Sequence, residues 1–452
     1  MVHASSAPSG KVKPGLVREL GLFDATMIVM GGIVGSGIFI NPYVVARQVH
    51  TPALILGAWI FGGAIAIAGA FIWAELVATL PEAGGQYVYL REAYHPALGF
   101  LYGWVLLLVI ETGGMAAVTI TFTRYFLELT GMQLPEWLVG VAAISVLTLI
   151  NCMGVKTGGR TQSVLMGMKI VCVASLVIIG LALAKHTIGM RAQEPSSLAS
   201  FGAAMIPVLF AYGGWQTANF VAAEVKSPGR NLPRALVIGV AGVILLYVTV
   251  NWVCLRALGV EGLAATTTPA TAVMRLALGG RGAALISAAI AISTLGFLSQ
   301  SILTAPRVYF AMAEDGLFFR GVARVDPHTH VPILAIVVQS VWAMAIAMSG
   351  RYEQILNYVV SMDFLFFALT ASTLFVFRRR RETMQGTATF RVPGHPITTA
   401  IFVAICCWIV ANTIYRYPQN TLIGVSVLVT GIPVYWFWSR KTRDAGRDQR
   451  TE

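Results

Sequence analysis

Long uncharged stretches separated by short polar segments dominate the chain. Runs of 29 and 21 uncharged residues lie between Glu194 and Glu224 and between Arg234 and Arg256. A helix needs about 20 apolar residues to cross a bilayer core about 30 Å thick. The pattern therefore predicts twelve membrane-spanning helices, at residues 22–49, 53–80, 96–128, 136–153, 162–185, 198–225, 233–257, 282–312, 331–349, 353–377, 395–417 and 420–439.

The composition excludes several other classes of protein. Charged residues make up 12% and hydrophobic residues 56% of the 452 residues, whereas soluble chains carry about 25% charged residues. A soluble enzyme and a disordered chain are therefore both excluded. The period-two alternation of a spanning β-barrel is absent, so we expect an all-α integral membrane protein.

The net charge of +12 predicts orientation rather than nucleic-acid binding. With the N-terminus in the cytoplasm, the inner segments hold 22 lysines and arginines and the outer segments hold 9. Positive residues favour the cytoplasmic side of a membrane. We therefore expect a multi-pass protein of the plasma (inner) membrane with both termini in the cytoplasm.

The first and sixth predicted spans contain clustered glycines. Span 1 reads GGIVGSGIF and span 6 reads FAYGGW, with Gly213 adjacent to Gly214. Glycine destabilises a helix by about 1 kcal/mol per site, so these clusters favour unwound backbone over close helix packing, the alternative use of small residues. The two spans occupy matching positions in two five-helix halves, which indicates a transporter binding site.

Unwound backbone in the membrane exposes groups that bind a zwitterion. The amides of Ser36 and Gly37 begin the second half of span 1 and suit a carboxylate. The carbonyls of Ile33 and of residues Phe210, Ala211 and Gly213 suit an ammonium group. This combination matches the main chain of a free amino acid.

These motifs resemble the amino acid–polyamine–organocation superfamily, and within it the L-type amino acid transporters and their bacterial relatives. Further similar stretches are AELVATLPEAGGQYVYLREAYHP, EVKSPGRNLPRAL and STLGFLSQSILTAPRVYFAMAEDGLFF. The resemblance implies a LeuT-type 5+5 inverted repeat with discontinuous helices 1 and 6 and two extra C-terminal helices. It predicts these segments: an N-terminal tail (1–20), a first repeat (21–186), a second repeat (198–380), helices 11 and 12 (395–440) and a C-terminal tail (441–452).

The resemblance also implies sodium-independent amino acid transport by alternating access. It assigns the substrate carboxylate to Ser36 and Gly37, an aromatic lid to Phe210 and pocket shaping to Trp215. The expected substrate-binding residues are Ile33, Val34, Gly35, Ser36, Gly37, Phe210, Ala211, Gly213 and Trp215.

Two ionisable residues inside spans are candidates for coupling and gating, because charge is costly in a membrane. Lys169 resembles a lysine that relatives carry where sodium-coupled transporters bind an ion, and it is expected to bridge span 1 carbonyls and the hydroxyls of Ser293 or Thr294. The alternative is a neutral lysine in a watery crevice. Glu111 either recognises a cationic side chain, transfers protons, or is a protonated carboxyl hydrogen-bonded in the bundle.

Other acidic residues receive structural assignments. We expect Glu75 to make a structural or gating contact near the inner end of span 2. Asp363 and Glu224 are expected to pair with inner arginines.

The sequence argues against an enzyme and against cofactors. The seven histidines lie in loops or at span edges without partners at metal-ligand spacing, and there is no P-loop. The five cysteines lie in apolar runs and predict no disulfide framework. The loop LELTGMQLPEW lacks the cysteine that links animal L-type transporters to a heavy chain, so no covalent heavy-chain subunit is expected.

The predicted function is an exchanger of neutral L-amino acids. A proton-coupled symporter, with cationic substrates bound through Glu111, is the first alternative, and a non-transporting amino acid sensor is the second. The exact substrate, the direction of transport and the oligomeric state stay open at this point.

Overall fold

The protein is an assembly of helices. The computed structural model describes residues 20–80, 84–183, 198–329, 331–349, 351–384 and 390–448. The predicted N-terminal tail lies outside these residues except for Leu20, whereas residues 441–448 of the predicted C-terminal tail belong to the last helix. The helices are α1 Leu22–Ile33, α2 Gly37–Gln48, α3 Pro52–Thr79, α4 Gln86–Ala93, α5 Pro96–Val105, η1 Leu106–Ile110, α6 Glu111–Thr130, α7 Glu136–Cys152, α8 Val155–Leu183, α9 Leu198–Tyr212, α10 Thr217–Phe220, η2 Ala222–Glu224, α11 Pro228–Ala265, α12 Pro269–Thr304, α13 Pro306–Glu314, η3 Arg320–Ala323, α14 Ile333–Ala347, α15 Tyr352–Met384, α16 Ile397–Arg416 and α17 Pro418–Asp448.

Many of these helices are suited to a membrane. Within the described residues, eight helical stretches are long and apolar enough to cross a bilayer. Four shorter apolar helices, α7, the described part of α8 from Gly167, α9 and α14, coincide with the other predicted spans. The chain is thus a multi-pass membrane protein, and the count of twelve spans stays a prediction.

The interruptions expected in spans 1 and 6 are present. Residues Val34–Ser36 separate α1 from α2, and the turn Gly213–Gln216 separates α9 from the short α10. α1 packs against α11, and α2 packs against α9. Each half of span 1 thus packs against a helix of the second predicted repeat.

Two helix boundaries differ from the predicted ones for local reasons. The predicted span 282–312 crosses a junction, because Pro306 lacks an amide hydrogen and begins a new helix, α13. α12 itself begins at Pro269 and contains a kink at Gly279, whose φ is 69°. The short helix α4 was not predicted, because its sequence QYVYLREA lacks the apolar length of a span.

The third span contains a wider helical turn that the sequence pattern did not reveal. Residues Leu106–Ile110 form a π-helical turn, η1, between α5 and α6. A π-turn accommodates an extra residue in an otherwise α-helical segment and often marks a functional site. Glu111 follows this turn directly, as the first residue of α6.

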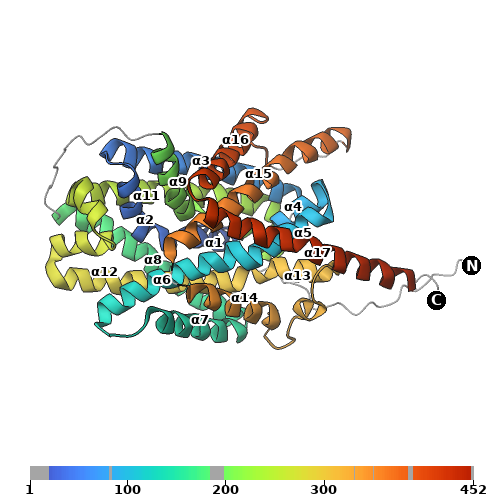
Figure 1. Cartoon of the computed structure of the whole chain (residues 1–452), viewed down its shortest axis with the longest axis horizontal. Helices are drawn as coiled ribbons and strands as arrows, with labels where there is room; N and C mark the ends of the chain where they lie inside the picture. Colours follow the sequence, from blue (N-terminus) through green and yellow to red (C-terminus); the bar gives the residue numbers. More distant parts are fainter. Residues whose placement is uncertain are drawn as a thin grey trace, which may run out of the picture.

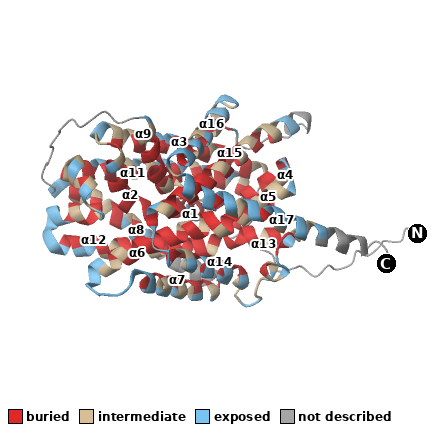
Figure 2. Cartoon of the chain, viewed as in Figure 1, coloured by how far each residue is buried: buried red, intermediate tan, exposed pale blue. Residues whose placement is uncertain are grey.

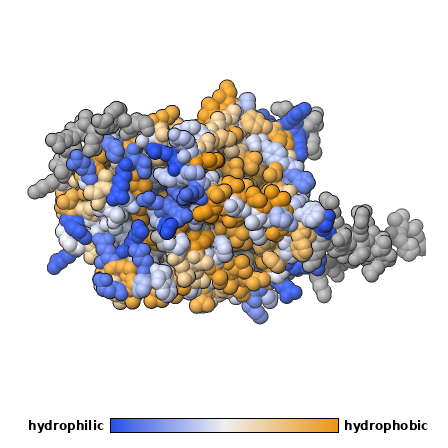
Figure 3. Space-filling view, in the orientation of Figure 1, coloured by the Kyte–Doolittle hydropathy of each residue, from blue (hydrophilic) through white to orange (hydrophobic). Residues whose placement is uncertain are grey.

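Buried residues run through the middle of the molecule around α1 and α6 (Figure 2). The helices α4 and α13 and the C-terminal part of α17 lie toward one end, and the start of α12 lies toward the other (Figure 1). Hydrophobic side chains cover the middle of the face in Figure 3, and the most hydrophilic ones gather mainly toward the ends. The least buried spans are α16 and α17.

Candidate functional site: a cavity at the two helix breaks

The two helix breaks touch through their backbones. Gly214 has a φ of 102°, and a Cβ at this position would lie 2.0 Å from the carbonyl oxygen of Gly32. A Cβ on Gly32 would lie 2.5 Å from Thr217 Oγ1. The Thr217 hydroxyl donates to the Gly214 carbonyl at 2.8 Å and closes the turn. Only glycine fits both positions, so the paired glycines of the sequence serve a backbone contact as well as unwinding.

Tyr247 of α11 connects the same two breaks. Its hydroxyl lies 2.9 Å from the carbonyl oxygen of Ile33 and 3.2 Å from that of Ala211, so its single proton is shared between the two acceptors. The Ile33 carbonyl also accepts the N–H of Gly35 at 2.8 Å. Two of the carbonyls expected to receive a substrate ammonium therefore already have donors. Tyr247 is not among the residues that the sequence predicted for the site, because its only signal is a tyrosine within an apolar run.

A cavity of about 750 Å³, including its opening, lies at the breaks. Its walls come from both breaks, from the start of α6, from α12 and from α15. Seven of the nine expected substrate-binding residues line it, namely Ile33, Gly35, Ser36, Gly37, Phe210, Ala211 and Gly213. The sequence motifs therefore located most of one continuous cavity.

The start of α2 faces this cavity with free donors. Among the described residues, the amides of Ser36, Gly37 and Ile38 have no hydrogen-bond acceptor. The Ser36 side chain is 1% exposed, and its hydroxyl lies within hydrogen-bonding range of the Tyr352 side chain. A Cβ on Gly37 would lie 2.6 Å from Ala211 Cα, so the two breaks also approach here. Amides at a helix start bind anions such as a carboxylate.

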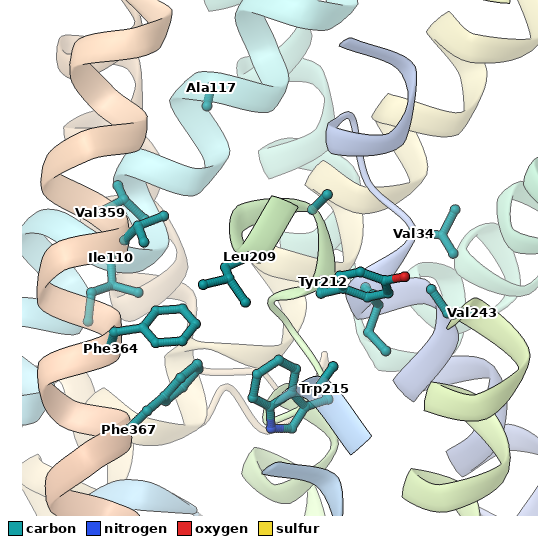
Figure 4. Close-up of a cluster of buried hydrophobic side chains, with 14 of the residues drawn as sticks. Val34, Ile110, Ala117, Leu209, Tyr212, Trp215, Val243, Val359, Phe364 and Phe367 are labelled. Carbon is teal, nitrogen blue, oxygen red and sulfur yellow. The ribbon is translucent and has the colours of Figure 1, made fainter. Parts of the chain in front are cut away.

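Two expected residues, Val34 and Trp215, do not line the cavity. Trp215 is fully buried, and its ring centroid lies 5.0 Å from that of Phe367 and 6.3 Å from that of Trp73. Figure 4 shows Trp215 beside Phe367, with Val34 on the far side of Tyr212. Trp215 therefore supports the turn from behind. Val34 and Trp215 lie in the unwound segments, where the backbone does not follow a helix. The order of residues therefore does not predict the direction in which these side chains point.

Two carboxyl groups line the cavity. Glu111 of α6 is hydrogen-bonded to Ser301 of α12, and Asp363 of α15 lies within electrostatic range of Glu111. The expectation that Asp363 pairs with an inner arginine was wrong, because Asp363 faces the cavity and its buried Oδ1 has no hydrogen-bond partner among the described residues. No lysine, arginine or histidine is among the described residues that line the cavity.

Lys169 lies behind span 1 rather than in the cavity. Its side chain is fully buried, and Nζ donates to the carbonyl oxygen of Gly31 at 3.3 Å. Nζ also lies 5.9 Å from the ring centroid of Phe297, which lines the cavity. The ammonium group thus sits behind the cavity wall, against the inner half of span 1.

The expected hydroxyl partners of Lys169 make no hydrogen bond with it in this structure. Thr294 Oγ1 bonds the carbonyl oxygens of Ile290 and Ala291 in its own helix, at 3.1 and 2.8 Å. Ser293 Oγ is buried without a partner among the described residues. Hydroxyls in a helix satisfy themselves on the preceding turn, which explains why Thr294 is already occupied.

Comparison with known proteins agrees with this architecture. The sequence model for amino acid permeases matches residues 20–438. The chain belongs to the amino acid permease family. Its relatives are transporters rather than enzymes, and the resemblance noted in the sequence is confirmed.

Three relatives span nearly the whole permease. The serine/threonine exchanger SteT of Bacillus subtilis is 30% identical over 430 residues, covering 93% of this chain and 97% of the relative. The large neutral amino acids transporter small subunit 2 of Homo sapiens is 28% identical, covering 97% and 84%. The cystine/glutamate transporter of Homo sapiens is also 28% identical, covering 96% and 89%.

Two ion pairs join separate segments of the permease outside the cavity lining. The Glu224 carboxylate accepts Nε of Arg307 at 3.2 Å, which confirms the expected pairing of Glu224. Glu75 is 2% exposed and accepts Arg378 Nε at 2.9 Å, Arg378 Nη2 at 2.7 Å and the N–H of Val392 at 2.6 Å. The structural contact expected for Glu75 is therefore present.

A third cluster lies on α4, which is not part of a candidate span. The Tyr87 hydroxyl and the Arg91 guanidinium both donate to Asp315 Oδ2. Burial, followed by the hydrogen bond to Asp315, raises the pKa of the Tyr87 phenol well above its usual range. Tyr87 therefore remains a hydrogen-bond donor at any physiological pH.

Proposed function

We propose that this permease carries L-amino acids across the plasma membrane by sodium-independent alternating access, as an exchanger. The observation that carries the proposal is the cavity at the two helix breaks, where free amides lie at the start of α2 and backbone carbonyls lie at the end of α9. These are the groups that bind the carboxylate and ammonium of a free amino acid.

Three features of the cavity recognise the carboxylate and ammonium groups of the substrate in this proposal. The amides of Ser36 and Gly37, with the Ser36 hydroxyl, bind the carboxylate. The Gly213 carbonyl, to which no described residue donates, accepts from the ammonium together with the Phe210 carbonyl, which also accepts the N–H of Gly213 at 3.3 Å. The carbonyls of Ile33 and Ala211 face the Tyr247 hydroxyl instead. Phe210 is half-buried at the cavity and acts as a lid.

Sodium independence rests on Lys169. Its amino group donates to a span 1 carbonyl and so occupies a ligand that a bound cation would need. Exchange is supported by the name of the relative SteT, a serine/threonine exchanger. The proposal includes twelve spans in two inverted repeats, cytoplasmic termini and no covalent heavy-chain subunit.

Neutral L-amino acids fit the apolar part of the cavity. Its walls include Val118, Leu209, Val359 and Phe364, and one relative is named for large neutral amino acids. A proton-coupled symporter is the second candidate, because two carboxyl groups, Glu111 and Asp363, lie in the same cavity and can take up protons.

Uptake into proteoliposomes tests these functions. Purified permease is reconstituted, and radiolabelled L-amino acids are supplied outside, with or without the same amino acid inside. Each condition is repeated with an inward sodium gradient and with an inward proton gradient. We expect uptake to require internal amino acid and to ignore both gradients.

Each other outcome has a defined meaning. Uptake driven by a proton gradient into vesicles without internal amino acid supports the symporter and rejects obligatory exchange. Dependence on sodium rejects the role given to Lys169. Binding without any uptake rejects transport and favours a sensor.

A further inference from the structure

A second pocket lies where two long helices begin. Its volume is about 860 Å³ including its opening, and its wall includes residues 351–354 at the start of α15 and residues 419–420 at the start of α17. We call it the α15–α17 pocket. Among the described residues, the amides of 352–353 and 419–420 have no backbone acceptor. Two helix starts therefore bring unpaired N–H groups, and the positive ends of two helix dipoles, to the same pocket.

Two arginines line the same pocket. Arg351 is exposed and forms no salt bridge within the part of the chain that the structure describes. Arg124 of α6 has its acidic partner, Glu136, only at 3.8 Å. Glu353 is the one acidic residue among the described residues of the lining, so positive charge exceeds negative charge there. Guanidinium groups with unused donors bind carboxylates.

A buried tyrosine hydroxyl is a second sign of a ligand in this pocket. Tyr43 of α2 lines the pocket and is only 4% exposed, and its hydroxyl has no hydrogen-bond partner among the described residues. The Arg47 guanidinium lies 4.9 Å from the centre of its ring. Arg124 and Glu353 lie within electrostatic range of the same tyrosine. A buried hydroxyl without a partner is costly, and a bound acceptor would remove that cost.

Tyr352 connects this pocket to the cavity at the helix breaks. It lines the α15–α17 pocket and is 4% exposed. Its hydroxyl donates to Asn41 Oδ1 at 3.1 Å and lies within hydrogen-bonding range of the Ser36 side chain. Ser36 in turn lines the cavity. One tyrosine thus contacts the α15–α17 pocket and the residue proposed to bind the substrate carboxylate.

We propose that the α15–α17 pocket is an entry site, which binds the carboxylate of a free amino acid before the amino acid reaches the cavity. The inference rests on the proposed function and adds a second binding site to it. Arg351, the amides of the two helix starts and the Tyr43 hydroxyl hold the carboxylate. Passage then requires the Tyr352 hydroxyl to leave Asn41 and Ser36, which opens the start of α2 to the same carboxylate.

Protection of a cysteine placed in the pocket tests occupancy directly. Gln419 is exposed and lines the pocket, and Gln419→Cys is treated with N-ethylmaleimide in the purified full-length permease. Mass spectrometry follows the peptide that holds position 419, because the native Cys407 is also exposed. We expect L-leucine and butyrate to slow the reaction, and butylamine and potassium chloride at the same concentrations to leave it unchanged. Butyrate lacks the ammonium that the main-chain site requires, so its protection reports this pocket.

Arg351→Gln tests the main contact. In the Gln419→Cys background it should raise the butyrate concentration needed for half protection by about tenfold, since a hydrogen bond to a charged group is lost. Arg281→Gln is the matched control, because Arg281 is an exposed arginine of α12 outside the pocket. This control should protect as the parent does. Equal losses in both variants would reject a specific role for Arg351.

Uptake into proteoliposomes tests the entry role. Arg351→Gln should raise the KM for L-leucine several-fold and leave the maximal rate unchanged, because a charge at the rim of a site acts mainly on association. Uptake by Gln419→Cys shows that the labelled variant is folded. An unchanged KM in Arg351→Gln would overturn the entry role.

Failure of the entry site and failure of the proposed function give different results. Leucine uptake without protection by butyrate or leucine overturns the entry site and leaves the proposed function intact. Protection by potassium chloride equal to that by butyrate also overturns the inference, since the pocket then attracts any anion. Protection by butyrate in a permease that transports none of the amino acids rejects the proposed function, and the entry role with it.

Discussion

The hydrogen bond between Lys169 and span 1 affects more of the backbone than the residue it contacts. The ammonium bonds the carbonyl of Gly31, and the backbone of the next residue, Gly32, touches the other break at Gly214. A positive group held against exposed carbonyls stabilises unwound backbone, which the membrane otherwise disfavours. Lys169 therefore connects α8 to the conformation of the cavity without touching the substrate.

We predict that Lys169→Ala folds but loses most transport, because the inner half of span 1 loses its link to α8. The measurement is amino acid uptake into proteoliposomes at matched protein density. Lys226→Ala is the control, since Lys226 is exposed and its removal should leave uptake unchanged. Near-wild-type uptake by Lys169→Ala would remove the residue from the mechanism.

At the scale of elements, the break between α9 and α10 requires a glycine at Gly214 more than at Gly213. Gly214 has a positive φ, and a side chain there would collide with the Gly32 carbonyl. Gly213 has only ordinary contacts, because a Cβ on it would lie 3.4 Å from its nearest neighbour atom, the carbonyl oxygen of Phe210. The two adjacent glycines therefore have different physical requirements.

We predict that Gly214→Ala destabilises the permease by more than about 1–2 kcal/mol, the cost of a left-handed conformation for a residue with a Cβ. Gly213→Ala should change stability by less than about 1 kcal/mol. Thermal unfolding in detergent, followed for both variants, checks the difference. Equal melting temperatures would show that the contact between the breaks does not contribute to stability.

The elements also show what the sequence could predict. The two breaks were predicted because clustered glycines are a local signal. Asp363 was placed wrongly, and Trp215 lies outside the cavity lining, because the direction of a side chain depends on how neighbouring helices are rotated, which local sequence does not determine. The hydroxyl partner expected for Lys169 in α12 was not found for the same reason, whereas the expected arginine partner of Glu224 was found in Arg307.

For the molecule as a whole, the ion pairs join segments far apart in the chain. Glu75 of α3 connects α15 and the segment that precedes α16, through Arg378 and the N–H of Val392. The two terminal spans are otherwise the least buried parts of the fold. Glu75 thus fastens the end of the second predicted repeat to the first.

We predict that Glu75→Ala lowers stability by about 3 kcal/mol, because it leaves Arg378 without its buried partner. Glu92→Ala should cost less than about 1 kcal/mol, since Glu92 forms a solvent-exposed pair with Arg91. Melting temperatures in detergent compare the two variants. A smaller loss for Glu75→Ala than for Glu92→Ala would contradict this account.

The π-turn before Glu111 gives the third span one place where its length can vary. η1 holds one residue more than a regular α-helix needs over the same path, and its wider turn absorbs that residue without changing the directions of α5 and α6. Deleting one residue from Leu106–Ile110 would therefore let α5 run into α6 as one regular helix, with Glu111 still facing the cavity. Deleting one residue from α5 instead would leave η1 in place and rotate α5 by about 100° against α6. The same change in length is thus tolerated in the turn and disruptive in the helix beside it.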